Sequence, residues 1–430
     1  MIEILSLISS TTIFYFFILL PKLVLSKNSS YKKNIFFYAI DNLTIFLFLM
    51  TLFSILRLNL YVSLYIICSL IFISLLTNFS YYIFLFKKNL IQVSIILLLI
   101  ILFNFELVNN IYLGFDGQAI WFKKAYFLKN NLDPINTTMP NYPFLGSYLW
   151  AFFWKFSIID LEHYGRFIYC IIFFISAVAY ISFNKVNDIY DYILFGFITY
   201  YIFETNYLFN GYQDILVFSL LIVFFHYFII FLNTRSKKNL IFLYLTAFIL
   251  SWTKNEANIY SCVALFSLFF LNKNKKFLII NFLFILIIFF HKFLIYEYYF
   301  GMNMSLQSEN YSFDSIYNFK INISNVLFIF FSFIKVFFKN LIIILIIPLI
   351  TFFYVNQKNF SKKESYLIKI LFLLFIVLIG VTFMFYIFTS FPLEWHISTS
   401  LDRLVFQLSS ILIYPSIIIF KKLPFKQKRT

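Results

Sequence analysis

The sequence predicts an all-α protein, a polytopic bundle of transmembrane helices. Of its 430 residues, 62% are hydrophobic and only 12% are charged, and the mean hydropathy is +0.88. Apolar runs such as VSIILLLIILF and LIIILIIPLI recur along the chain, and a helix needs about 20 such residues to cross a bilayer. Because no water-soluble domain buries so much apolar surface, we expect no soluble domain in this chain.

The basic residues decide the predicted topology. The formal net charge is +16, but the lysines and arginines stand in short clusters between apolar runs, which is typical of cytoplasmic anchors and not of a nucleic-acid interface. With every cluster on the cytoplasmic side, the apolar segments pair into hairpins and predict about thirteen spans in the plasma (inner) membrane, with the N-terminus outside. The expected spans are 4–25, 36–56, 60–86, 89–109, 164–183, 190–204, 212–232, 239–252, 258–271, 277–296, 338–355, 365–390 and 403–420.

This topology divides the chain into three parts. They are the N-terminal spans in 1–109, a large outer loop in 110–163, and the remaining bundle in 164–430. Two short apolar segments, 144–158 and 323–337, do not fit as spans, so we expect them to be helices at the outer interface, where amphipathic aromatic-rich segments are stable. Segment 117–130 alternates apolar and basic faces at helical spacing and predicts another interfacial helix.

Asp116 is the first candidate site residue, at the start of the outer loop in FDGQAIWFKKA. It follows a span directly and precedes a helix, so it can cap that helix by accepting from free backbone N–H groups. It can also act as a general base, because partial desolvation at the water–lipid boundary raises the basicity of a carboxylate. A divalent metal ion at Asp116 is left open, since one carboxylate is a thin ligand set.

The turn MPNYPFLG follows in the same loop. Its prolines stop a helix and favour an extended turn, and Tyr142 suits the membrane interface. Ordinary interfacial anchoring accounts for this pattern. The functional interpretation makes Trp121, Lys124 and Tyr142 residues that bind or support a substrate beside Asp116.

Two further stretches place charges among apolar residues. Asp214, in GYQD, stands at the outer mouth of a span, where it can cap a helix or serve a site. Lys254 and Glu256, in TKNEA, separate two segments that are short for full spans. Interrupted helices at membrane depth line cavities, and ionisable groups there are functional candidates. A simple Lys254–Glu256 pair in a loop remains the alternative.

The last stretch is FPLEWHISTSLDRLVFQL, within which 391–403 joins two apolar segments. Thr399 and Asp402 have the spacing of a capping box, so Asp402 can serve the final helix alone. His396 and Arg403 are not explained by capping. An arginine inside an apolar segment, as at Arg403 and also at Arg166, can bind phosphate through its planar fork or can snorkel to the interface.

Together these stretches resemble the GT-C class of multi-spanning glycosyltransferases, and more narrowly its bacterial protein-mannosyltransferase-like relatives. The matching pieces are FDGQAIWFKKA with NYPFLG, then GYQD, TKNEA and WHISTSLDRL, in that order between residues 110 and 410. Under the predicted topology they share the outer side, where most of the 18 carboxylates also fall. Each piece alone is weakly specific, whereas the combination is moderately specific.

The resemblance implies transfer of a sugar from a polyprenyl-phosphate donor to a lipid, glycan or protein acceptor on the periplasmic, extracytoplasmic face. Asp116 would then be the catalytic base. Lys254, His396 and Arg403 would bind the donor phosphate, because a phosphate leaving group needs cationic stabilisation. Asp214, Glu256 and Asp402 would support the substrates. Direct displacement with inversion needs no protein nucleophile.

Two other functions fit the same residues. A transporter or flippase of a lipid-linked or polar solute also uses polar groups in broken helices, and an O-antigen-type polymerase or ligase also consumes lipid-linked sugars. A carrier should place polar groups on both faces and show repeated halves, and the sequence has neither pattern. The chain also lacks a Walker loop, a dinucleotide glycine fingerprint, HExxH and a nucleophile elbow, so no soluble cofactor is expected.

Overall fold

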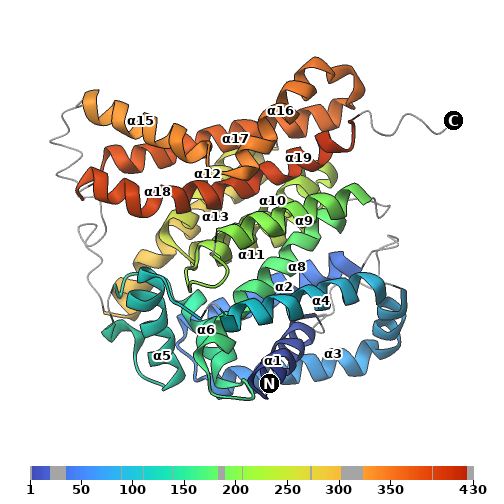
Figure 1. Cartoon of the computed structure of the whole chain (residues 1–430), viewed down its shortest axis with the longest axis vertical. Coiled ribbons are helices and arrows are strands. Elements are labelled where there is room, and N and C mark those ends of the chain that lie inside the picture. The colour runs from blue at the N-terminus through green and yellow to red at the C-terminus, as the bar shows by residue number, and fades with distance from the viewer. Residues whose placement is uncertain are drawn as a thin grey trace. The chain divides into compact units, whose positions relative to one another are not determined.

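All regular secondary structure in the described part of the chain is helical, as the computed structural model shows (Figure 1). The structure describes residues 2–19, 35–88, 90–109, 111–137, 139–182, 189–205, 207–271, 274–301, 323–389 and 391–423. These residues contain α-helices with a few short 3-10 and π turns and no strand. The all-α prediction is therefore confirmed for them.

The chain divides into two compact units, which we describe separately. The first unit comprises Met1–Asn187 and Ile202–Asn258. Its helices are α1 (Ile2–Leu19), α2 (Ile35–Ile55), α3 (Leu60–Lys88), α4 (Leu90–Asn109), η1 (Gly117–Phe122), α5 (Lys123–Lys129), η2 (Pro134–Asn136), α6 (Leu145–Lys155), α7 (Glu162–Arg166), α8 (Ile168–Ser182), α10 (Asp214–Thr234) and α11 (Lys237–Ser251). Helix α10 packs between α8 and α11, and α2 contacts the same two helices. The side chains of α10 are buried almost along its full length, so α10 forms the core of this unit.

Helix α6 lies in the segment predicted to be a helix at the outer interface, and it is buried within the first unit. All of its residues from Leu145 to Trp154 are buried, and α5, α7 and α2 pack against it. Its aromatic rings find partners within the protein, since Phe153 meets Phe14 edge-on with centroids 4.4 Å apart. The apolar surface that would favour the lipid interface is thus covered by protein, which the local sequence pattern does not reveal.

The second unit comprises Asp188–Tyr201 and Ile259–Thr430. Its helices are α9 (Ile189–Glu204), α12 (Asn255–Leu271), α13 (Lys275–Leu294), η3 (Ile295–Tyr299), α15 (Ile323–Phe337), α16 (Leu341–Val355), η5 (Gln357–Asn359), α17 (Lys362–Ile387), α18 (Leu393–Ser409), η6 (Ser410–Leu412) and α19 (Ile413–Phe420), with α9 and α12 extending a few residues into the first unit. Helix α17 contacts α15, α18 and α19, at the orange and red end of the chain in Figure 1. Most side chains of α15 are exposed, and they are largely apolar.

Several helices are long and apolar enough to cross a membrane, which fits a membrane protein. Among the residues that the structure describes, four meet this description by themselves: Asp214–Thr234, Lys275–Tyr299, Lys362–Ile387 and Leu393–Phe420. Helices α15 and α16 meet at an 85° bend and make a fifth span if both belong to one broken helix. Other apolar helices have 10–17 residues, short of the roughly 20 that a full crossing needs. The expected count of about thirteen spans is therefore not confirmed.

Candidate functional site

The loop that contains Asp116 packs on the loop that leads to α10. The backbone N–H of Gly114 donates to the carbonyl oxygen of Asn210 at 2.9 Å. A Cβ on Gly117 would lie 2.3 Å from that same oxygen, so the approach requires glycine. Gly211 turns the second loop with a positive φ of 78°, a conformation that favours glycine. The FDG and NGY stretches thus come into contact through Gly114, Gly117 and Gly211.

Asp116 lies at the entrance to η1, half-buried, with helical backbone angles. Its side chain makes no capping hydrogen bond to that helix. The capping explanation for an aspartate at this position is therefore wrong. What the carboxylate does instead stays a prediction, and the base role is compatible with its half-buried position.

Lys124 ties α5 to the turn that follows it. It is 0% exposed, and its ammonium donates to the carbonyl oxygens of Met139 at 2.7 Å and Tyr142 at 2.8 Å. The Tyr142 ring lies edge-on to Trp121 with centroids 5.6 Å apart. The predicted basic face of segment 117–130 is thus interrupted, because carbonyl oxygens and aromatic rings hold this lysine inside the protein. Trp121, Lys124 and Tyr142 form one structural group.

Asp214, Lys254 and Glu256 form a buried charge cluster. The Lys254 ammonium lies 3.1 Å from Asp214 Oδ1 and 2.8 Å from Glu256 Oε1. The side chains are 8% exposed for the lysine, 1% for the aspartate and 17% for the glutamate. Asp214 begins α10, whereas Lys254 stands at the break between α11 and α12. The cluster contains one cation and two carboxylates, so its formal charge is −1 with all three groups ionised.

Gln213 connects this cluster to the start of α6, the helix that follows the turn held by Lys124. With its amide oriented to satisfy both partners, Gln213 donates to the carbonyl oxygen of Thr253 at 2.9 Å and accepts from the N–H of Ser147 at 3.3 Å. A Cβ on Gly146 would lie 2.3 Å from the Gln213 side chain, so glycine gives it room. All four stretches that the sequence singled out before residue 258 therefore converge in the first unit.

His396, Asp402 and Arg403 lie on α18 of the second unit. His396 Nδ1 is 2.7 Å from Thr389 Oγ1, and its ring packs on Tyr386 with centroids 5.0 Å apart. Asp402 is exposed, and Arg403 is half-buried. The three residues were expected to lie in and just after a loop, but α18 already begins at Leu393.

The predicted capping box of Thr399 and Asp402 is wrong for the same reason. Both residues lie inside α18, where Thr399 Oγ1 donates to the carbonyl oxygen of Trp395 at 2.9 Å. A threonine in a helix interior bonds to the preceding turn in this way and caps nothing. Asp402 thus has no capping role, and its proposed support of a substrate stays a prediction.

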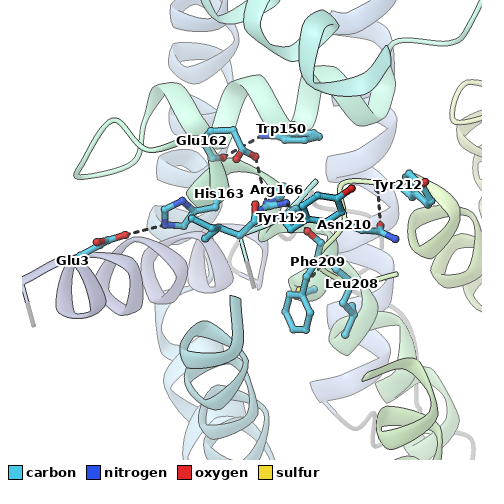
Figure 2. Close-up of polar contacts among 12 residues, drawn as sticks. Glu3, Tyr112, Trp150, Glu162, His163, Arg166, Leu208, Phe209, Asn210 and Tyr212 are labelled. Carbon is cyan, nitrogen blue, oxygen red and sulfur yellow. Dashed lines mark hydrogen bonds and ion pairs between the residues drawn. The ribbon is translucent and has the colours of Figure 1, made fainter. Parts of the chain in front are cut away.

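Arg166, noted in the sequence only as an arginine inside an apolar segment, lies beside Glu162 and against the loops of Asp116 and Asp214. Figure 2 shows Arg166 directed at the backbone of two loops, with Glu162 beside it. The guanidinium is 1% exposed and donates to the carbonyl oxygens of Ile111, Tyr112 and Phe209. The available signal was the i, i+4 spacing of an acid and an arginine at the edge of an apolar stretch, which predicts a pair but no partner loops.

No cluster of three or more His, Cys, Asp or Glu side chains that could hold a metal ion occurs in the described part of the chain. Asp116 offers one carboxylate, which is a poor ligand set for a divalent ion without further oxygen donors. The divalent ion at Asp116 stays a prediction. Comparison with known proteins finds no family model, no curated protein and no solved structure that matches this chain.

Proposed function

We propose that this protein is a membrane glycosyltransferase that moves a sugar from a polyprenyl-phosphate donor to an acceptor on the extracytoplasmic face of the plasma membrane. One observation carries the proposal: the FDG, NYPFLG, GYQD and TKNEA stretches, far apart in the sequence, converge in one unit. The membrane face and a count of about thirteen spans rest on the distribution of the basic clusters.

The proposed chemistry is a single displacement. Asp116 accepts the proton of an acceptor hydroxyl while that oxygen attacks the anomeric carbon. The bond from the anomeric carbon to the donor phosphate breaks, and the polyprenyl phosphate leaves with the electron pair. Attack from the face opposite the leaving group inverts the anomeric centre, and the lipid, glycan or protein acceptor gains the sugar.

The charged groups divide the remaining tasks. Asp214 and Glu256 support the sugar or the acceptor through hydrogen bonds to hydroxyl groups, and Lys254 holds them in place. Two carboxylates already neutralise Lys254, and the roles of His396 and Arg403 in binding the donor phosphate rest on the resemblance and on the chemistry of their side chains alone. Lys254 contributes to phosphate binding only when the phosphate displaces one of the carboxylates.

The test is Asp116→Asn in membranes supplied with lipid-linked sugar. We expect the variant to lose sugar transfer by about 100-fold or more, because general base catalysis contributes about 100-fold to 10,000-fold, while the protein level is unchanged. Asp160→Asn is the matched control, since Asp160 is exposed in the same loop and makes an ion pair with Lys129. Retained transfer in Asp116→Asn removes this residue as the base.

A transporter or flippase is the second candidate, because the buried cluster of Asp214, Lys254 and Glu256 lies at the break between α11 and α12. Carriers place their sites at such helix breaks. The two functions differ in their product, since a carrier moves a lipid-linked sugar without making a glycosidic bond. Mass analysis of surface glycans and lipids from cells that lack the protein separates them. An O-antigen-type polymerase or ligase would instead show shortened or unattached glycan chains.

A further inference from the structure

Arg166 connects two loops that the chain separates by almost 100 residues. Its NH1 atom donates to the carbonyl oxygens of Tyr112 at 3.2 Å and Phe209 at 2.5 Å, and its NH2 atom donates to Ile111 at 2.6 Å (Figure 2). Its Nε lies 3.4 Å from Glu162 Oε1. The guanidinium thus donates to backbone oxygens of two different loops, and the Glu162 carboxylate lies beside its positive charge.

The carbonyl groups that Arg166 binds stand four or five residues ahead of two candidate site residues. Ile111 and Tyr112 precede Asp116 in one loop, and Phe209 precedes Asp214 in the other. Beyond this point the loops remain in register through the hydrogen bond from Gly114 to Asn210. Moving Arg166 would therefore shift the origin of both loops together.

The chemistry of the contact requires arginine. Three carbonyl oxygens at 2.5–3.2 Å are shared between two nitrogens of one rigid plane. A lysine ammonium has one nitrogen on a flexible stem, so it cannot occupy both nitrogen positions. The Phe209 carbonyl, whose contact with Arg166 is buried, would lose its donor at a cost in free energy, so its loop would move to find another partner.

We propose that Arg166 is a positioning residue, which holds the loops of Asp116 and Asp214 at the separation that sugar transfer requires. This assignment rests on the proposed function and adds a residue that touches neither donor nor acceptor. A residue that only stabilised the fold would lower the amount of folded protein without slowing the chemical step of the molecules that remain folded.

Glu162 supports Arg166 without making the carbonyl contacts itself. Trp150 Nε1 donates to the Glu162 backbone oxygen at 3.2 Å, which fixes α7 against α6. The neighbouring polar contact is that of His163 with Glu3, whose Nε2 and Oε1 atoms are 3.3 Å apart. Arg166 is therefore the one residue of this group whose own atoms bind both loops.

The experiment compares Arg166→Lys with Arg57→Lys in purified full-length protein. Arg57 is the matched control because it lies in the same unit and makes a partly exposed ion pair with Asp133. We expect Arg166→Lys to lower kcat about 100-fold, the size of effect that a displacement of about 1 Å produces, with KM for the donor within about threefold. We expect Arg57→Lys to behave like the wild type.

Hydrogen exchange supplies a readout that does not depend on sugar transfer. In Arg166→Lys, amides of 111–116 and 207–213 should exchange about tenfold faster or more, while those in α10 keep their protection. Unchanged exchange in both loops overturns the proposal, as does a wild-type kcat. If the wild type transfers no sugar from any lipid-linked donor, the proposed function is wrong, and the catalytic role of Arg166 is wrong with it. The exchange result still decides whether Arg166 holds the two loops in place.

A second variant covers the case in which Arg166→Lys does not fold. Arg166→Ala leaves an open cradle of carbonyl oxygens, which added ethylguanidinium can fill. We expect millimolar ethylguanidinium to restore at least about tenfold of the lost kcat and to slow exchange in both loops. If neither variant yields folded protein, or if ethylguanidinium restores nothing, Arg166 is a folding determinant and the proposal is wrong.

Discussion

Two buried lysines in the first unit, Lys124 and Lys254, have their charges stabilised by different kinds of partner. Both are at least nine-tenths buried. Lys124 donates to two backbone carbonyl oxygens and lies 5.0 Å from the centroid of the Phe144 ring. Lys254 lies between two carboxylates, those of Asp214 and Glu256. One cation is thus stabilised by dipoles and a π face, and the other by opposite charge.

The difference separates a structural lysine from one that organises a charged site. Dipoles and ring faces stabilise a cation without becoming charged themselves, so removing Lys124 leaves no ion behind. Removing Lys254 leaves two carboxylates in a site of low polarity, where an uncompensated charge is costly. Lys254 and the two carboxylates therefore depend on one another for stability, whereas Lys124 stabilises the turn at 139–142.

Lys254→Met should have the largest effect. We expect the free energy of unfolding to fall by about 3–5 kcal/mol, the cost of leaving buried charges without their partner. Thermal unfolding in detergent, followed by tryptophan fluorescence, measures it. Adding Asp214→Asn and Glu256→Gln to the same chain removes the carboxylate charges and should recover most of the loss. A variant as stable as the wild type would contradict the mutual dependence of the three groups.

Lys124→Met should cost less, about 1.5–3 kcal/mol, because it removes charged hydrogen bonds but leaves only neutral carbonyl groups behind. The same unfolding measurement applies. Lys123→Met is the control, since the neighbouring Lys123 is exposed on α5 and should contribute little. A loss larger than that of Lys254→Met would reverse the comparison between the two lysines.

Glu162→Gln tests a third buried charge and should have the smallest effect. Burial raises the pKa of Glu162 from 4.5 to about 7, although Arg166 opposes the rise. The unfolded chain ionises this carboxyl near its ordinary pKa, so wild-type stability is highest below that value and falls as the pH rises to about 7. The variant should lack this decline.

At pH 8 we expect the free energy of unfolding of Glu162→Gln to exceed that of the wild type by about 1–2 kcal/mol. One pKa unit corresponds to about 1.4 kcal/mol, and solvent screens part of the effect. Stability is followed from pH 4 to pH 8 for the variant and for Asp160→Asn, whose carboxylate is exposed. Parallel curves for Glu162→Gln and wild type would show that Glu162 ionises normally. If Asp160→Asn also lacks the decline in stability with rising pH, the decline comes from surface charge in general and not from Glu162.

The sequence by itself determined the helical class and the positions of most helices. Apolar composition leaves helices as the spanning structure of choice, and polar breaks between the apolar runs set their ends. The short helices on either side of Lys254 were predicted at 239–252 and 258–271 and are observed at Lys237–Ser251 and Asn255–Leu271. The stretches that converge around Asp214 were also recognisable, because charges stand out in an apolar chain.

Only the tertiary structure decided which neighbours each polar group meets. Lys124 appeared to belong to a basic helix face, the sequence of α6 does not reveal that protein covers it from Leu145 to Trp154, and Arg403 was placed at the start of a span instead of within α18. Helical periodicity depends on residues a few positions apart, but burial and pairing depend on segments that are distant in sequence. The carbonyl groups of 111–112 and 209 that Arg166 binds carry no side-chain signal, so no pattern of residue types could have named them.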